Sequence, residues 1–216
     1  MKKISSIDLF AGVGGMRIAL AKALKKMGYI DDCKLYSEID CYSQQTYREN
    51  FPMTKLIEDI KSVAKKDIDV MIPNHDILLA GFPCQPFSKA GISKRKNLKR
   101  AYGFEDKEQG DLFFNILDIL NIKKPKAFIL ENVQNLKTYK NGEVLNEILK
   151  RLRKNFYVPE PEILDAQDFG LAQRRKRIFI VGFETFNGQF NFPLPTYKKT
   201  TVKDFLDSYP QKKYTI

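Results

Sequence analysis

Short apolar runs of strand length alternate with segments of helical periodicity along most of this chain. Parallel strands need long crossover connections, usually helices, so this alternation is typical of a parallel α/β sheet. Strands are expected at Ile4–Phe10, Lys34–Ser37, Lys55–Ile57, Asp76–Ala80, Ala127–Leu130 and Arg177–Gly182, and helices at Met16–Met27, Asp111–Ile122 and Glu143–Lys154. The sequence therefore predicts a doubly wound α/β domain with a mostly parallel sheet.

The composition allows one good-sized domain, because 43% of the 216 residues are apolar. Lys and Arg total 37 against 26 Asp and Glu, which gives a formal net charge of +11. Such an excess attracts polyanions, of which nucleic acid is the commonest. A lysine-rich proteome would produce the same excess, so the charge indicates a nucleic-acid partner only in combination with other features.

Three cysteines, Cys33, Cys41 and Cys84, are an odd number without CxxC spacing. This favours neither a disulfide framework nor a zinc site, and it fits the reducing cytoplasm. We interpret Cys33 and Cys41 as small buried side chains. The single histidine, His75, argues against a Ser-His-Asp site and a histidine-rich metal site, so no metal is expected. The apolar runs are far shorter than the ~20 residues of a membrane-spanning helix, so no membrane association is expected.

A glycine-rich turn follows the first expected strand, in the stretch Asp8-Leu9-Phe10-Ala11-Gly12-Val13-Gly14-Gly15. Glycine lets the backbone approach a ligand closely, and the start of the following helix offers free N–H groups. The GxGG spacing departs from the GxGxxG dinucleotide fingerprint, which disfavours an NAD-dependent dehydrogenase. A tight turn without a ligand is the alternative interpretation.

Carboxylates end the second and third expected strands, as Glu38-Ile39-Asp40 and Glu58-Asp59-Ile60. Open α/β sheets bind ligands at the carboxyl ends of their strands, and an acid about two dozen residues after the glycine turn commonly holds a ribose. Each acid taken singly could be a solvated surface group. Together with the glycine turn, they predict a nucleoside cofactor, with Asp59 at an adenine amino group.

The loop after the fourth expected strand, Gly81-Phe82-Pro83-Cys84-Gln85-Pro86-Phe87-Ser88, places a cysteine between two prolines. Prolines hold the backbone extended, and a cysteine on a rigid loop at the carboxyl edge suits a nucleophile once its thiolate is stabilised. The cations that follow are expected to grip phosphates, with a solvated loop as the alternative. They are Lys89, Lys94, Arg95, Lys96, Lys99 and Arg100.

Two further polar motifs accompany the last strands, Glu131-Asn132-Val133 after the fifth and Gln173-Arg174-Arg175-Lys176-Arg177 leading into the final one. At an edge shared with Cys84, Glu131 could act as a general acid or hydrogen-bond donor if burial favours its protonated form. Alternate residues of a strand share a face, so Arg175 and Arg177 could point together at a base or phosphate. A surface cationic cluster is the usual alternative.

Taken in order, DLFAGVGG, SEID, EDI, GFPCQPFS, ENV and QRRKRIF resemble the motifs of the cytosine-5 DNA methyltransferases, over Ile4 to about Gly182. The resemblance implies a Rossmann-like S-adenosylmethionine-dependent methyltransferase fold. It also implies an enzyme that methylates C5 of cytosine in double-stranded DNA and leaves S-adenosylhomocysteine. The target base must be flipped out, because C5 is inaccessible in a stacked duplex. A bacterial or phage-encoded cytoplasmic protein is expected.

Carried over residue by residue, the resemblance assigns Cys84 as the nucleophile that adds to cytosine C6 and Glu131 as the partner of N3. Arg175 and Arg177 would position the flipped base. The resemblance and the residue patterns together predict a set of cofactor-binding residues. They are Asp8, Phe10, Gly12, Gly14, Gly15, Glu38, Ile39, Asp59, Ile60, Gly81 and Pro83. The DNA-binding residues are Gln85, Ser88, Lys89, Lys94, Arg95 and Lys96.

Two departures from the family pattern change what is expected. Ala172 stands where a proline commonly precedes the glutamine of the arginine motif, a small change in loop stiffness. The chain stops at Ile216, before the family's target-recognition region and the late motif that completes the cofactor pocket. We therefore expect a catalytic and cofactor-binding domain at 1–185 and a tail at 186–216. A second chain or a missing C-terminal part would be needed for full activity.

Two other functions are compatible with these residues. A catalytically silent truncated fragment would bind cofactor or DNA weakly, although the intact Cys84 and Glu131 argue against gradual decay. A transfer-RNA cytosine-5 methyltransferase is the second, since one branch of the family acts on RNA. The Phe-Pro-Cys-Gln form of the loop is similar to the DNA branch.

Overall fold

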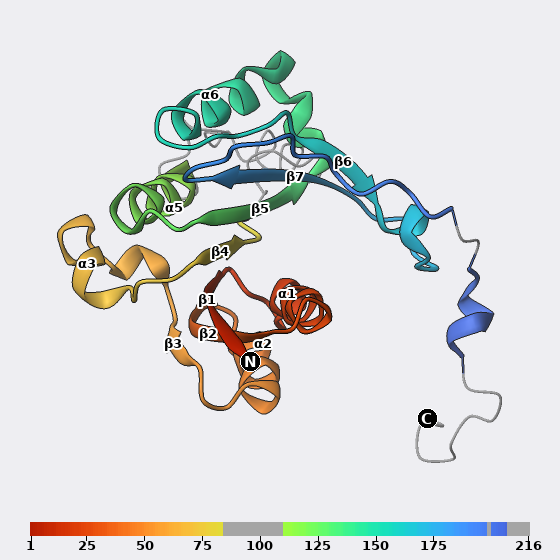
Figure 1. The fold of residues 1–216 in the computed structure, drawn as a ribbon, viewed down its shortest axis with the longest axis horizontal. Coiled ribbons are helices and arrows are strands. Elements are labelled where there is room, and N and C mark those ends of the chain that lie inside the picture. Colours follow the sequence, from red (N-terminus) through yellow and green to blue (C-terminus); the bar gives the residue numbers. More distant parts are fainter. Residues whose placement is uncertain (84–109, 198–199, 207–216) are drawn as a thin grey trace, which may run out of the picture.

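The computed structural model describes residues 1–83, 110–197 and 200–206 (Figure 1). The strands are β1 (Lys2–Leu9), β2 (Tyr29–Ser37), β3 (Lys55–Ile57), β4 (Ile77–Ala80), β5 (Ala127–Val133), β6 (Glu162–Asp165) and β7 (Lys176–Phe183). The helices are α1 (Gly15–Lys26), α2 (Cys41–Asn50), α3 (Ile68–Met71), α5 (Gly110–Lys123) and α6 (Glu143–Leu152), with short 3-10 turns between several of them. None of the helices in these ranges has the length and apolar character that a bilayer crossing requires.

All seven strands form one sheet in the order β3-β2-β1-β4-β5-β7-β6. The pairs β2–β3, β1–β2, β1–β4 and β4–β5 are parallel, whereas β7 runs antiparallel to both β5 and β6. The prediction of a doubly wound, mostly parallel sheet is therefore confirmed. Strand order reverses between β1 and β4, which is where such sheets open a crevice at their carboxyl edge.

The two faces of the sheet differ in chemistry. Residues that alternate along each strand share a face, and one face packs a wholly apolar core against α3, α5 and α6. Strand residues of this core include Ile7, Leu9, Leu35, Leu78, Phe128, Leu130, Ile178 and Ile180. The opposite face of β1 carries the buried polar side chains Ser6 and Asp8. In Figure 1, α1 lies on one side of β1 and β4, and α3 and α5 lie on the other.

Helices α2 and α3 and strand β6 were not predicted, and α2 and β6 show why. Helix α2 has the sequence CYSQQTYREN, which lacks an apolar stripe, and it begins because the Asp40 side chain accepts a 2.7 Å hydrogen bond from the Ser43 backbone N–H. Strand β6 has only four residues and a largely exposed pattern, so its pairing with β7 stabilises it more than its composition does. Tertiary contacts override weak local signals in both elements.

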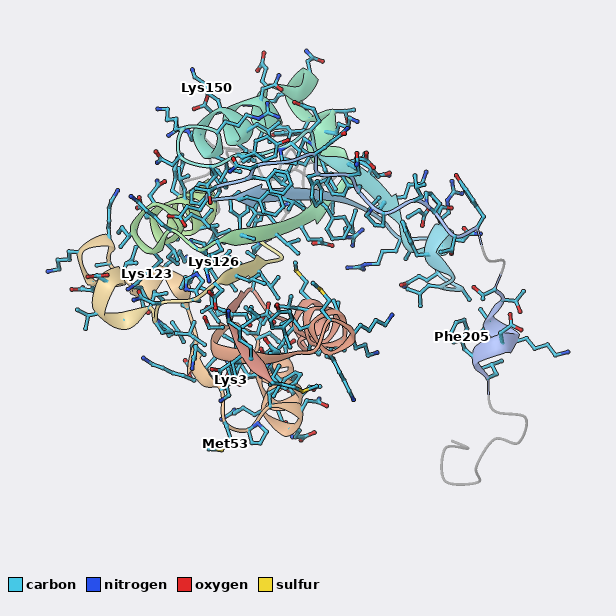
Figure 2. All side chains as sticks on the ribbon, viewed as in Figure 1. Lys3, Met53, Lys123, Lys126, Lys150 and Phe205 are labelled. Carbon is cyan, nitrogen blue, oxygen red and sulfur yellow. The ribbon has the colours of Figure 1, made fainter. Side chains whose placement is uncertain are left out.

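Two local predictions were wrong. Glu131-Asn132-Val133 lies within β5 and not after it, because β7 pairs with β5 as far as Val133. Cys33 is buried as predicted, but Cys41 is exposed at the first turn of α2. Beyond β7 the chain turns back past β6, where the Thr196 backbone N–H donates to the Asp168 carbonyl at 2.9 Å. Figure 2 shows Phe205 on a later turn, well apart from the side chains that cover the sheet.

Gly182 in β7 supplies a test of core packing. A Cβ at this position would overlap the ring of Phe128. This ring is fully buried and packs edge-on against the ring of Phe156, with the two ring centroids 5.3 Å apart. We expect Gly182→Ala to lower the free energy of unfolding by about 1–3 kcal/mol in urea denaturation, because overpacking forces the ring and backbone apart. The control is Gly188→Ala, where the nearest atom would lie 3.6 Å from the new Cβ. Equal stability of the two variants would contradict this packing account.

Candidate active site

Two cavities open at the carboxyl edge of the sheet, on either side of Phe10 and Gly81. The first is named the catalytic cavity after the role that the sequence predicts for Glu131. It has a volume of about 500 Å³ and is lined by Asp8, Phe10, Ala11, Val13, Gly15, Met16, Gly81, Glu131, Leu164, Ala166, Phe169, Arg175, Arg177 and Phe179. The second is named the nucleoside cavity after the ligand that the sequence predicts for Glu38 and Asp59. It has a volume of about 200 Å³ and is lined by Phe10, Ser37, Glu38, Ile39, Glu58, Asp59, Ile60, Gly81, Pro83 and Leu112. Phe10 and Gly81 line both cavities and so form their common wall.

The glycine turn has a left-handed backbone conformation at three positions, two of which are glycines. Phe10, Gly12 and Gly14 all have positive φ, at 56°, 54° and 90°, a region that L side chains rarely adopt. At Gly14 a Cβ would also lie 2.9 Å from the ring of Phe51, which directly follows α2, and 3.1 Å from the ring of Tyr47 in α2. The left-handed conformation of Phe10 is a strained backbone feature of the kind that clusters at functional sites.

Asp8 lies at the end of β1 beneath this turn. Its side chain lines the catalytic cavity, the residue is 1% exposed, and the Tyr47 hydroxyl donates to its Oδ2 at 3.4 Å. Burial raises the pKa of Asp8 to about 8, an effect that the nearby Arg17 guanidinium partly offsets. At neutral pH the protonated carboxyl can therefore donate a hydrogen bond as well as accept one.

Glu38 connects the glycine turn to α2. Its Oε2 accepts from the backbone N–H of Gly12 at 2.7 Å, and its Oε1 accepts from that of Asp40 at 2.9 Å. Each carboxylate oxygen has a second lone pair, so both can still accept from a ligand. Across the nucleoside cavity, Asp59 Oδ1 accepts from the Lys61 backbone N–H at 2.9 Å. Ile39 lines the same cavity and is 72% exposed, so a large apolar surface faces the entrance.

Strand register brings Glu131 together in the catalytic cavity with Arg177 of β7 and with Arg175, which directly precedes β7. Glu131 pairs with Phe179, so Arg177, two residues earlier in β7, is its diagonal neighbour on the same face. Arg177 Nε lies 2.8 Å from Glu131 Oε1, and Arg175 Nη2 lies 3.9 Å from the same oxygen. The structure thus brings Glu131, Arg175 and Arg177 together, with Arg177 as the direct partner of Glu131.

The loop that carries Cys84 leaves the sheet beside Glu131. A Cβ added at Gly81 would lie 3.7 Å from Glu131 Oε2, so the two residues are close neighbours. Asn132 Nδ2 donates to the Phe82 carbonyl at 3.3 Å. The buried Asn132 therefore fixes the start of this loop. The remaining predicted residues lie outside the described part of the chain. They are Cys84, Gln85, Ser88, Lys89, Lys94, Arg95 and Lys96.

Several lining residues were missed by the sequence interpretation. Leu164, Ala166 and Phe169 come from β6 and the turn after it, and β6 has no clear signal in the sequence. A third, open cleft of about 570 Å³ borders the catalytic cavity and includes Arg174 and Lys176 besides the two predicted arginines. The QRRKR motif could have indicated these two cations. In residues 1–83, 110–197 and 200–206, no group of His, Cys, Asp or Glu side chains is arranged to hold a metal ion.

This sheet order, with an antiparallel β7 and a glycine turn after β1, defines the Rossmann-like fold of the S-adenosylmethionine-dependent methyltransferases. The sequence matches the family described as C-5 cytosine-specific DNA methylase over residues 4–216, and the chain belongs to this family.

Comparisons with individual proteins agree with this assignment. The chain is 45% identical over 210 residues to Type II methyltransferase M.NlaX of Neisseria lactamica, a match that covers 97% of this chain and 62% of that protein. It is 42% identical over 224 residues to Type II methyltransferase M.DsaV of Dactylococcopsis salina, covering 100% and 56%. The chain thus spans about six-tenths of these relatives. Its fold is similar to Entamoeba histolytica methyltransferase EhMeth, with a TM-score of 0.74 at 23% identity over 100% of this chain and 63% of that one.

The raised pKa of Asp8 predicts a pH dependence of stability. A carboxyl whose pKa is about 8 when folded and near 3.8 when unfolded stabilises the fold most below about pH 3.8, and this contribution is lost as pH rises through about 8. We expect the stability of the wild type relative to Asp8→Asn to fall between pH 5 and 8, by at most about 1.4 kcal/mol per pH unit. Urea denaturation at several pH values measures this. Glu49→Gln, at an exposed position of α2, is the control, and parallel curves for wild type and Asp8→Asn would contradict the prediction.

Proposed function

We propose that this protein is a DNA (cytosine-5)-methyltransferase that uses S-adenosylmethionine. The observation that carries the proposal is the position of Glu131, which shares a cavity wall with Gly81, three residues before Cys84, and pairs with Arg177 at 2.8 Å. A nucleophile and a hydrogen-bonding carboxyl group at one cavity are what addition to a pyrimidine ring requires. Membership of the C-5 cytosine-specific family supports the same conclusion.

The residues of the nucleoside cavity fit the adenosine part of S-adenosylmethionine by their chemistry. Glu38 offers carboxylate oxygens for a ribose diol, and Asp59 offers an acceptor for an adenine amino group. Ile39 and Ile60 provide apolar surface for the base. Gly81 and Phe10, at the common wall, would lie where the cofactor passes toward the catalytic cavity. When bound there, S-adenosylmethionine supplies the methyl group that cytosine C5 accepts.

The protein's own residues activate cytosine C5. The Cys84 thiolate adds to C6, and the electron pair of the C5–C6 double bond moves to C5 while Glu131 hydrogen-bonds N3. After methylation the C5 proton leaves, the C5–C6 double bond re-forms, and the bond from C6 to the Cys84 sulfur breaks. Arg177 holds the Glu131 carboxyl group in place, so it would fix the hydrogen bond to N3. The target base must leave the duplex to reach this cavity.

Double-stranded DNA is the substrate that we propose. The open cleft next to the catalytic cavity presents Arg174, Arg175, Lys176 and Arg177, a cationic surface suited to a phosphate backbone. The relatives named above are Type II methyltransferases, which supports a role in DNA modification. They are also longer than the matched region, which supports target recognition by further sequence in the same polypeptide or a second chain.

Covalent trapping tests the proposed chemistry. We expect the chain, mixed with S-adenosylmethionine and duplex DNA in which 5-fluorocytosine replaces cytosine, to give a shifted band on a denaturing gel. Fluorine cannot leave C5 as the proton does, so the bond between Cys84 and C6 should persist. Cys84→Ala should give no band, while Cys41→Ala, which removes an exposed cysteine of α2, should behave as wild type. Trapping of a fluorinated transfer RNA in preference to DNA would overturn the choice of substrate.

Cofactor binding gives a second test that does not depend on DNA. We expect Glu38→Ala to raise the Kd of S-adenosylmethionine at least about tenfold, measured by isothermal titration calorimetry, because it removes the acceptor for the ribose and frees two backbone N–H groups. Glu49→Ala, at an exposed position of α2, is the matched control and should leave the Kd unchanged. An unchanged Kd in Glu38→Ala would remove Glu38 from the cofactor site.

A further inference from the structure

Arg17 is a buried arginine behind the glycine turn, and the reaction described above does not use it. It lies in the first turn of α1, is 9% exposed, and takes part in a connected polar group. Its Nε lies 3.2 Å from Asp31 Oδ2 in β2, and its Nη1 donates to Thr54 Oγ1 at 2.8 Å. Asp31 in turn accepts from Ser6 Oγ of β1 at 2.8 Å. One guanidinium therefore joins α1 to β2, to the start of β3 and, through Asp31, to β1.

Two aromatic rings, one in α2 and one directly after it, also contact this guanidinium. Its central carbon lies 3.8 Å from the centroid of the Phe51 ring and 5.6 Å from that of Tyr47. Nη1 also donates to the Tyr47 hydroxyl at 3.3 Å, and the Tyr47 ring stacks on Tyr36 of β2 with centroids 3.8 Å apart. Cation–π contacts of this kind are strongest where water is excluded, as it is here.

The same two rings form the floor of the glycine turn. Tyr47 and Phe51 are the residues that a Cβ at Gly14 would meet at 3.1 and 2.9 Å, so the turn rests directly on them. The Tyr47 hydroxyl also reaches Asp8, which lines the catalytic cavity. Arg17 is not among the described residues that line either cavity. Its contacts with Tyr47 and Phe51 connect it to the glycine turn, and the hydrogen bond from Tyr47 to Asp8 connects it to the catalytic cavity.

We propose that Arg17 is a positioning residue for cofactor binding. By holding the rings of Tyr47 and Phe51 in contact with Gly14, it fixes the position of the glycine turn that S-adenosylmethionine requires. The inference rests on the proposed function, because it concerns the glycine turn that borders the proposed cofactor site. Its physical basis is that removal of the guanidinium takes away the charged partner of Asp31 and a hydrogen-bond donor to Thr54. The loss of these contacts lets the two rings shift. A shift of the rings moves the turn, since Gly14 has no free space above them.

Calorimetric titration of S-adenosylmethionine into the full chain at low temperature tests the proposal. Arg17→Met keeps much of the side-chain volume but removes the charge and the hydrogen bonds, and we expect its Kd to rise about tenfold. Arg17→Lys keeps the charge but cannot span Asp31 and Thr54 with a planar fork, so a rise of about threefold is expected. The matched control is Arg151→Met on α6, which breaks an ion pair to Glu147 of the same helix and a cation–π contact to Phe114 of α5. Its Kd should stay within about twofold of wild type.

Hydrogen exchange in the ligand-free chain separates the inference from the proposed function. The Gly14 backbone N–H donates to the Ala11 carbonyl at 2.9 Å within the turn. We expect this amide to exchange at least about tenfold faster in Arg17→Met, with the amides of β5 unchanged. Failure of the wild type to bind S-adenosylmethionine, with this exchange effect present, would overturn the proposed function. A folded Arg17→Met with wild-type Kd and wild-type exchange at Gly14 would overturn the role of Arg17. If Arg17→Met does not fold, the Kd of S-adenosylmethionine and the exchange rate of the Gly14 amide in Arg17→Lys test the role of Arg17 instead.

Discussion

The antiparallel pairing of β7 with β5 is the interaction on which the catalytic cavity depends. Because β7 runs against the parallel strands, its first residues lie at the edge where β1, β4 and β5 end. Arg175, just before β7, and Arg177, near its start, are thereby brought beside Glu131, which is more than forty residues earlier in the chain. A parallel β7 would place Arg177 at the opposite edge of the sheet.

A second constraint is the unequal chemistry of the two faces of the sheet. The face beneath α3, α5 and α6 is apolar and supplies most of the buried core. The face beneath α1 holds Asp8, Arg17 and Asp31 in a nearly water-free environment. Buried charges cost stability unless they are paired and hydrogen-bonded, so this group must keep a definite geometry. The catalytic cavity lies on this polar side, which gives the site a rigid support.

The single wall between the two cavities explains how one short turn serves both. Phe10 adopts a left-handed backbone conformation, and the turn after it is held by Glu38 on one side and by the rings of α2 on the other. A nucleoside bound at Glu38 and a base bound at Glu131 would therefore be separated by little more than Phe10 and Gly81. Close approach of two substrates in fixed orientation is a large part of what an enzyme contributes to group transfer.

The sequence by itself determined the α/β class, the glycine turn and the acids that follow β2 and β3, because strand periodicity, glycine content and strand-end position are local properties. It also placed Arg175 and Arg177 on one face. Only the tertiary structure decided that Glu131 lies within β5, that β6 completes the cavity, and that Arg17 is buried against α2. These features depend on pairing register and on contacts between distant segments, which a weak local pattern such as that of α2 or β6 does not specify.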